Sequence, residues 1–278
     1  MTDYVSGKSI VITGAAGGFG SLVARRCAAR GAMVTLGDID LDAAEALAGE
    51  LNAAGGKAQA VRVDVTRLAE VKALVEKAVA AFGTIDVMIN NAGIMPLAFI
   101  ADHEAAYAAW ERCIDINIKG VLNGMVAAHD AMIAQGRGHV INLSSIYGNF
   151  PVTGAAVYGA SKAAVNFLSE SLRVEARGKI KVTTIKPTGV PSTGLSGTVI
   201  NPAAGIGIVG QNMADFGAMI AGMQDGSFPA ERLDPENIDY ASLASEHIAD
   251  AIVHAIDQPW GVSIAEMTVR GAGDHFIL

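Results

Sequence analysis

The sequence predicts an α/β fold, a doubly wound parallel sheet of about seven strands with helices on both faces. Short apolar runs alternate with helical patterns of about ten or more residues, which is typical of right-handed βαβ units. The runs are apolar at consecutive positions, as strands that are covered on both faces require. No linker or repeat interrupts the alternation, so we expect residues 1–278 to form a single domain.

The first half of the chain contains the first four predicted strands. Residues 9–13 (SIVIT) form a β-rich run, which passes through a glycine-rich turn into a helix over 21–30 that Gly31 ends. Further short apolar runs predict strands, and longer periodic segments predict helices. These strands are expected at 33–36, 58–63 and 85–89, and these helices at 43–51 and 68–82.

The second half continues the pattern and then departs from it. The stretch 102–135 predicts one long helix or two. The remaining strands are expected at 140–143, 182–185 and 263–269, and the remaining helices at 155–177 and 245–256. Residues 188–240 are rich in Gly, Pro, Ala and Met without a clear period, so we expect a substrate-binding insertion with one short helix near 211–223.

The composition excludes several classes of protein. The net charge of −8 argues against a nucleic-acid or anionic membrane partner, and no run of 18 apolar residues predicts a membrane span. The N-terminus has no basic segment followed by an apolar one, so we expect a cytoplasmic protein. Cys27 and Cys113 are expected to be free thiols, and the histidines show no spacing that predicts a metal site.

The turn after the first strand predicts a dinucleotide site. Gly14, Gly18 and Gly20 allow the backbone to approach a pyrophosphate, which the free N–H groups of the helix N-terminus attract. Their spacing departs from GxGxxG, and a plain tight turn is the alternative. Asp38 ends the second strand, where a carboxylate accepts hydrogen bonds from the adenosine ribose and repels a 2′-phosphate, favouring NAD over NADP. Alternatively, Asp38 only begins a turn with Asp40.

A tyrosine and a lysine predict acid–base chemistry. Tyr158 and Lys162 are four residues apart on the helix over 155–177 and therefore share a face. We expect the ammonium group to lower the pKa of Tyr158, which can then act as a general base towards an alcohol or a general acid towards a ketone. Ser145 or its neighbour Ser144, after the strand at 140–143, can hold the substrate oxygen.

Three motifs together resemble the short-chain dehydrogenase/reductase family, from about Lys8 to Val269. They are the glycine turn, Asn90-Asn91-Ala92-Gly93, and Tyr158-Gly-Ala-Ser-Lys162. The resemblance implies a Rossmann-like fold, selects Ser145 over Ser144 by its spacing to Tyr158, and adds Asn117, whose backbone would help to hold a water in a proton relay to Lys162. It also implies the cofactor-binding residues, which are Gly14, Gly18, Phe19, Gly20, Asp38, Asp64, Val65, Asn91, Ala92, Gly93, Tyr158, Lys162, Pro187, Val190 and Thr193.

One segment departs from the family pattern. After the strand at 182–185 the chain reads Lys186-Pro187-Thr188-Gly189-Val190, so Thr188 stands where the family has glycine. Val190 still suits backbone contacts to the nicotinamide carboxamide. Ser192 and Thr193 remain alternative partners for the carboxamide or phosphate. The resemblance places Asn90 beside the adenosine ribose, and a purely structural role is the alternative.

The substrate is expected to be apolar and uncharged. Between Thr188 and Ala230 the only formal charges are Asp215 and Asp225, so no basic residue is available to bind a carboxylate or phosphate. A hydrophobic secondary alcohol or ketone of aliphatic, terpenoid, aromatic or steroid type fits this composition, although many of the apolar residues could instead belong to the core or to a subunit interface. The predicted substrate contacts are Met95, Ser145, Tyr147, Phe150, Tyr158 and Leu195.

The sequence therefore predicts an NAD-dependent oxidoreductase with no resident metal. One alternative is a non-catalytic NAD-binding or scaffold protein, against which the complete catalytic set argues. The other is a sugar-nucleotide epimerase, which shares the Tyr–Lys pair but is usually longer. The family resemblance also implies a homodimer or homotetramer, in which the helices over 102–135 and 155–177 pack across subunits.

Overall fold

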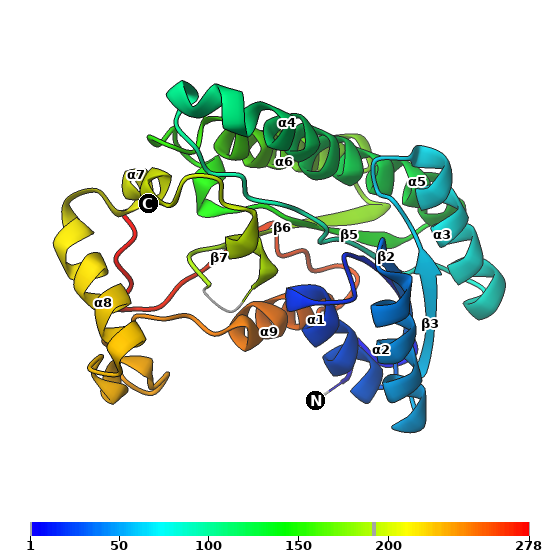
Figure 1. Ribbon diagram of the computed structural model, residues 1–278. Helices are drawn as coiled ribbons and strands as arrows, with labels where there is room; N and C mark the ends of the chain where they lie inside the picture. The colour runs from blue at the N-terminus through cyan, green and yellow to red at the C-terminus, as the bar shows by residue number, and fades with distance from the viewer. Residues whose placement is uncertain (1, 191–192, 278) are drawn as a thin grey trace.

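The computed structural model describes residues 2–190 and 193–277, which fold around one parallel sheet (Figure 1). The strand order is β3-β2-β1-β4-β5-β6-β7, and every neighbouring pair is parallel. The predicted fold class is confirmed. The strands are β1 (Ser9–Thr13), β2 (Met33–Asp38), β3 (Lys57–Arg62), β4 (Val87–Asn90), β5 (Gly138–Leu143), β6 (Ile180–Pro187) and β7 (Glu266–Val269).

Helices cover both faces of the sheet. One face carries α1 (Gly18–Ala29), α2 (Leu41–Ala53) and α9 (Ser245–Ile256), and the other carries α3 (Leu68–Phe82), α4 (His103–Cys113), α5 (Gly120–Ala134) and α6 (Ala156–Glu175) (Figure 1). Two large clusters of buried aliphatic side chains fill the two helix–sheet interfaces. Because β4 and β5 are buried at every position, the alternating pattern of a half-exposed sheet is absent there.

The strand order reverses at β1, and this positions the site. β1 pairs with β2 on one side and with β4 on the other, so the chain leaves the carboxyl ends of β1 and β4 in opposite directions. Ligands of open α/β sheets bind in the crevice that forms at such a point. The predicted glycine turn and the Asn90-Asn91-Ala92-Gly93 motif both follow strands at this crevice.

The stretch predicted as one helix or two contains two α-helices with no loop between them. A π-helical turn, Ile114–Lys119, joins α4 to α5 without a loop. Such turns add a residue to one helical turn and are frequent at functional sites. This one contains Asn117.

The segment after β6 extends beyond the sheet. Its helices are α7 (Ile206–Val209) and α8 (Met213–Asp225), and α8 overlaps the predicted helix near 211–223. Figure 1 shows α8 at one side of the molecule, where the C-terminal tail returns beside it. Within the described ranges no helix combines the length and apolar character that crossing a membrane requires.

Candidate active site

The glycine turn leaves free space at Gly17 and Gly18, where a dinucleotide phosphate would lie, and is tightly packed at Gly14 and Gly20. Gly14 and Gly18 have φ angles of +64° and +50°. A Cβ on Gly20 would lie 2.3 Å from the carbonyl oxygen of Gly14, so this glycine is required for packing. A Cβ on Gly17 or Gly18 would meet no atom within 4 Å. Because α1 begins at Gly18, the free space lies at a helix N-terminus, and the turn fits a pyrophosphate.

The Asn-Asn-Ala-Gly motif fastens β4 to this turn. The Asn91 Nδ2 donates to the carbonyl oxygens of Thr13 and Gly14 at 3.0 and 2.8 Å. Asn90 is fully enclosed, and its Nδ2 donates to Asn142 Oδ1 at 2.8 Å. The contacts of Asn90 are therefore those of the structural alternative, whereas Asn91 shapes the crevice itself.

Two acidic side chains lie at the ends of β2 and β3. Asp38 Oδ2 accepts a hydrogen bond from the Ala16 backbone N–H at 2.8 Å, which ties it to the glycine turn. Its Oδ1 accepts from the Asp40 N–H at 3.1 Å, so the turn with Asp40 is also formed. Asp64 Oδ1 accepts from the N–H and hydroxyl of Thr66. Asp38 is thus held beside the glycine turn, and its role in ribose recognition stays a prediction.

The predicted acid–base pair lies beside the end of β5. Tyr158 and Lys162 are both buried on α6, with the Lys162 Nζ 5.7 Å from the centre of the Tyr158 ring. This Nζ donates to the carbonyl oxygen of Leu143 at 2.8 Å. Ser145 shares a hydrogen bond with Tyr158, whereas the Ser144 hydroxyl donates to the backbone oxygen of Lys162 at 3.1 Å. The structure therefore brings Ser145, and not Ser144, to the tyrosine.

Burial dominates the protonation of this pair. Burial raises the pKa of Tyr158 above its ordinary value, and the hydrogen bond with Ser145 opposes only part of that rise. Burial also lowers the pKa of Lys162 to about 8. The predicted lowering of the Tyr158 pKa by the ammonium group is therefore wrong in its net direction, because the cost of desolvating the phenolate dominates the shift.

Asn117 acts through its side chain on the loop after β4. The side chain is fully buried in the π-helical turn. Its Oδ1 accepts from the Ile94 N–H at 3.0 Å, and its Nδ2 donates to the Ile94 carbonyl oxygen at 2.9 Å and to Ser161 Oγ at 3.0 Å. A Cβ on Gly93 would lie 3.2 Å from Asn117 Oδ1. These contacts fix the loop, and the water-holding role of the Asn117 backbone stays a prediction.

A cavity of about 520 Å³, here called the central cavity, joins these groups. Its walls are mostly apolar, and Tyr158 lies edge-on to Tyr147, with ring centres 5.3 Å apart. The predicted residues that line it are Gly14, Gly18, Phe19, Asn91, Ala92, Gly93, Met95, Ser145, Tyr147, Tyr158, Lys162, Pro187, Val190, Thr193 and Leu195.

Other predicted residues lie outside the central cavity. Phe150, predicted to touch substrate, is 61% exposed and does not line it, because the chain turns outward after the 3₁₀ turn Ile146–Gly148. Gly20 packs beneath the turn, and Asn117 lies behind the wall. Asp38 lies at the end of β2, and Asp64 and Val65 follow β3, so their predicted contacts with the adenosine stay predictions. Ser192 lies outside the described residues.

Sequence reasoning missed part of the wall. Ala241 and Ser242, before α9, and His275 and Phe276, in the C-terminal tail, also line the central cavity. The tail follows the last strand without any motif, so no local pattern indicated that it returns to the site. In the described residues no cluster of His, Cys, Asp and Glu has the makings of a metal site.

Relatives of this chain are oxidoreductases. A family model described as short chain dehydrogenase matches residues 8–202. An uncharacterized oxidoreductase of Staphylococcus haemolyticus is 34% identical over 271 residues, covering 97% of this chain and 99% of that protein. Glycine betaine reductase ATRR of Emericella nidulans is 35% identical over 267 residues, covering 96% of this chain, which spans only 19% of that protein's length.

Solved structures with the same fold hold nicotinamide dinucleotides. One is 7α-hydroxysteroid dehydrogenase complexed with NADH and 7-oxo glycochenodeoxycholic acid, with a TM-score of 0.78, 25% identity, and coverage of 98% of this chain and 96% of that one. Another is a metagenomic short-chain oxidoreductase in complex with NADP, with a TM-score of 0.71, 28% identity, and coverage of 96% and 98%. Relatives of this fold thus include both NADH and NADP complexes.

Proposed function

Because this chain belongs to the short-chain dehydrogenase/reductase family of oxidoreductases, we propose that it interconverts a hydrophobic secondary alcohol and its ketone with NAD(H). One observation carries the proposal. Tyr158, Ser145 and Lys162 converge on an apolar cavity that also opens onto the glycine turn, so a proton-transfer group and a cofactor site face the same space. This arrangement suits removal of a hydride and a proton from one alcohol.

The chain's own residues handle the proton and the substrate oxygen. Ser145 is placed to donate a hydrogen bond to that oxygen beside Tyr158. In the reductive direction the neutral Tyr158, which its raised pKa favours, donates its proton to the developing alkoxide. In the oxidative direction Tyr158 first loses its own proton, the Lys162 ammonium stabilises the resulting phenolate, and the phenolate oxygen then accepts the alcohol proton. The bound nicotinamide supplies the hydride acceptor or donor.

Asp38 supports a preference for NAD. Its carboxylate lies at the end of β2 and is held to the glycine turn by the Ala16 N–H. A fixed negative charge there repels a 2′-phosphate. Replacing Asp38 by Asn should lower the ratio of kcat/KM for NAD over NADP about tenfold or more, since about 1.4 kcal/mol corresponds to tenfold. Asp40→Asn, which removes a neighbouring charge at the start of α2, is the control and should leave the ratio nearly unchanged.

The acid–base role is tested by removing a single oxygen. We expect Tyr158→Phe to retain nucleotide binding by fluorescence titration and to lose about 10²–10⁴-fold in kcat on a panel of hydrophobic secondary alcohols. Tyr147→Phe is the matched control, because Tyr147 lines the same cavity and touches Tyr158. Turnover of Tyr158→Phe near that of the wild type would refute the mechanism. Nucleotide binding without any turnover by the wild type would favour a non-catalytic binding protein.

We also propose that the protein forms a homodimer or homotetramer, and exposed apolar side chains support this. Large apolar side chains are exposed on α4, α5 and α6, which lie together on one face of the molecule (Figure 1). Phe167 and Val174 are each 75% exposed on α6, and Tyr107 is 61% exposed on α4. Exposed apolar side chains on neighbouring helices favour association with a second copy.

A further inference from the structure

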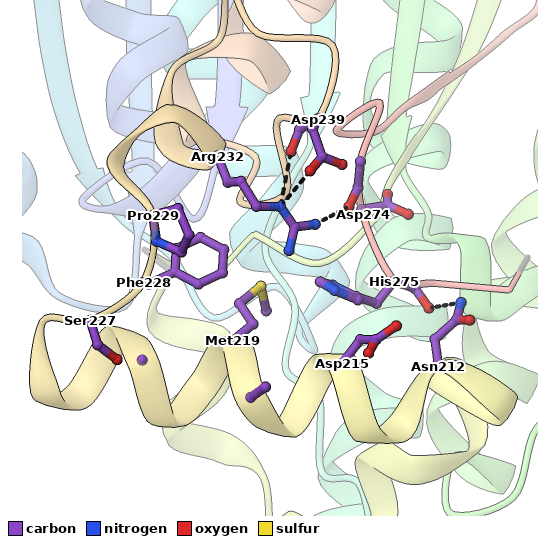
Figure 2. Close-up of a pocket in the computed structure, with 13 residues that line it drawn as sticks. Asn212, Asp215, Met219, Ser227, Phe228, Pro229, Arg232, Asp239, Asp274 and His275 are labelled. Atoms are coloured by element: carbon purple, nitrogen blue, oxygen red, sulfur yellow. Dashed lines mark hydrogen bonds and ion pairs between the residues drawn. The ribbon is translucent and has the colours of Figure 1, made fainter.

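A second cavity lies beyond the central one. This distal cavity has a volume of about 500 Å³ and lies between α8, the turn Ala230–Leu233 and the C-terminal tail (Figure 2). Met219 and His275 line both cavities. The two spaces therefore share a wall that is made in part of one thioether and one imidazole.

The two cavities differ in chemistry. Where the central cavity approaches α8, its wall is apolar and includes Phe216 and Ile220. The charged residues that line the distal cavity are Asp215, Asp239, Asp274 and Arg232. The guanidinium group of Arg232 pairs with Asp239 at 2.9 Å, and Asp274 pairs with Arg270, so Asp215 leaves the cavity with an excess of negative charge.

His275 is a buried polar ring that lacks a partner. The residue is 6% exposed, and its Nδ1 is buried without a hydrogen-bond partner among the described residues. The ring packs edge-on against Phe216 at 6.0 Å between centres, and Asn212 Nδ2 donates to the backbone oxygen of His275 at 2.9 Å. Figure 2 shows the imidazole directed into the cavity, towards Met219 and Arg232. A buried ring nitrogen that lacks a protein partner and faces a cavity is a place where a polar group of a ligand can bond.

We propose that the substrate spans both cavities and carries a second polar group that hydrogen-bonds to His275. The alcohol carbon then lies at Tyr158, and the apolar body fills the central cavity. Because the unbranched methionine side chain can adopt several rotamers, Met219 can move aside to open the shared wall. The excess of carboxylates favours a hydroxyl or amino group over an anion at the far end. This inference rests on the proposed function and names its substrate class as a long secondary alcohol with a distal hydroxyl or amino group.

Matched substrates test the role of His275. The kcat/KM values of 2-alkanols of about eight to twelve carbons are compared with those of the same alcohols bearing a terminal hydroxyl at the opposite end. The wild type should prefer the hydroxylated partner about 3- to 10-fold at the chain length that spans the cavities, as one ordinary hydrogen bond predicts. His275→Phe keeps a ring against Phe216 and removes both nitrogens, so it should lose this preference, which is measured as the ratio of the two kcat/KM values within the same variant. His275→Asn should restore part of the preference.

Two aspartates on α8, substituted one at a time, test which terminal group of the substrate the distal cavity prefers. Asp215→Asn should reduce the preference for a terminal amine over a terminal hydroxyl, because it removes a carboxylate that lines the distal cavity. Asp225→Asn, at the other end of α8 and outside that lining, is the matched control and should leave the preference unchanged.

The outcomes separate this inference from the proposed function. An equal preference for the hydroxylated alcohol in wild type and His275→Phe overturns the inference, as does a wild-type preference for a terminal carboxylate. If His275→Phe does not fold, Met219→Phe provides the test, because the larger ring should block the passage between the two cavities. Retention of the preference for the hydroxylated alcohol in that variant also overturns the inference. Failure of the wild type to oxidise any secondary alcohol with NAD or NADP refutes the proposed function instead.

Discussion

The side chain of Asn117 offers a sharp test of how the active-site loop is held. Its side-chain amide accepts a hydrogen bond from the Ile94 N–H and donates one to the Ile94 carbonyl oxygen. It also donates to Ser161 Oγ. Gly93 and Met95, on either side of Ile94, line the central cavity. Asn117→Ala should therefore both destabilise the protein and loosen the cavity wall.

The size of the effect follows from these contacts. Each of the three hydrogen bonds contributes about 1 kcal/mol net, and the alanine leaves backbone groups of Ile94 without their partner, so the loss is about 2–4 kcal/mol. Unfolding a chain of 278 residues carries an entropy of about 0.6 kcal/mol/K. The Tm of Asn117→Ala should therefore fall by about 3–7 °C.

Asn52 provides the control, because it forms the same pair of bonds in a different environment. Its Oδ1 accepts from the Ala58 N–H at 2.8 Å, and its Nδ2 donates to the Ala58 carbonyl oxygen at 2.9 Å. Both hydrogen bonds are exposed to solvent. Water replaces these bonds when they are removed, so Asn52→Ala should cost about 1 kcal/mol or less. This variant should also leave kcat and the KM for nucleotide unchanged.

Scanning fluorimetry and steady-state kinetics decide between the outcomes. Asn117→Ala should show the larger fall in Tm and a higher KM for nucleotide, whereas Asn52→Ala should show neither. Equal shifts in the two variants, together with unchanged kinetics in Asn117→Ala, would refute the argument that this side chain fixes the loop.

Three further predictions concern stability, pH and assembly. Gly124→Ala should cost about 1–3 kcal/mol in urea unfolding, since its Cβ would lie 1.8 Å from Asn90 Oδ1, whereas Gly49→Ala, with no atom within 4 Å, should stabilise by up to about 1 kcal/mol. Burial lowers the pKa of Lys162 from 10.5 to about 8, so the unfolded chain binds more protons between these values. Stability relative to Lys162→Met should thus rise by about 3 kcal/mol from pH 8 to pH 10.5, and a constant difference would contradict this. Phe167→Lys should lower the mass measured by light scattering, if α6 forms the subunit interface.

The sheet was predictable because local patterns and global burial agree. The boundaries of β1, α3 and α9 match the predicted ranges, since turn residues and glycines border each apolar run. The carboxyl end of β6 extends further than the apolar run does. There Lys186 and Pro187 join the sheet through pairing with β7, which no local pattern reveals.

The reacting groups were predictable to a greater extent than the walls around them. Tyr158 and Lys162 are four residues apart on one helix, so their meeting follows from helix geometry alone. The return of His275 to the cavity depends on the path of a tail that has no regular structure after β7. The direction of the Tyr158 pKa shift was missed for a similar reason, because desolvation depends on the completed fold.

The separation of the reacting groups from much of the apolar wall has a consequence for evolvability. Tyr158 and Lys162 belong to a helix packed on the sheet, whereas Phe216, Met219 and His275 belong to α8 and the tail. Substitutions in these outer segments change the shape of the cavity without disturbing the helix that carries the proton-transfer groups. Mutant libraries confined to α8 and the tail should therefore yield altered substrate ranges with a high proportion of folded, active variants.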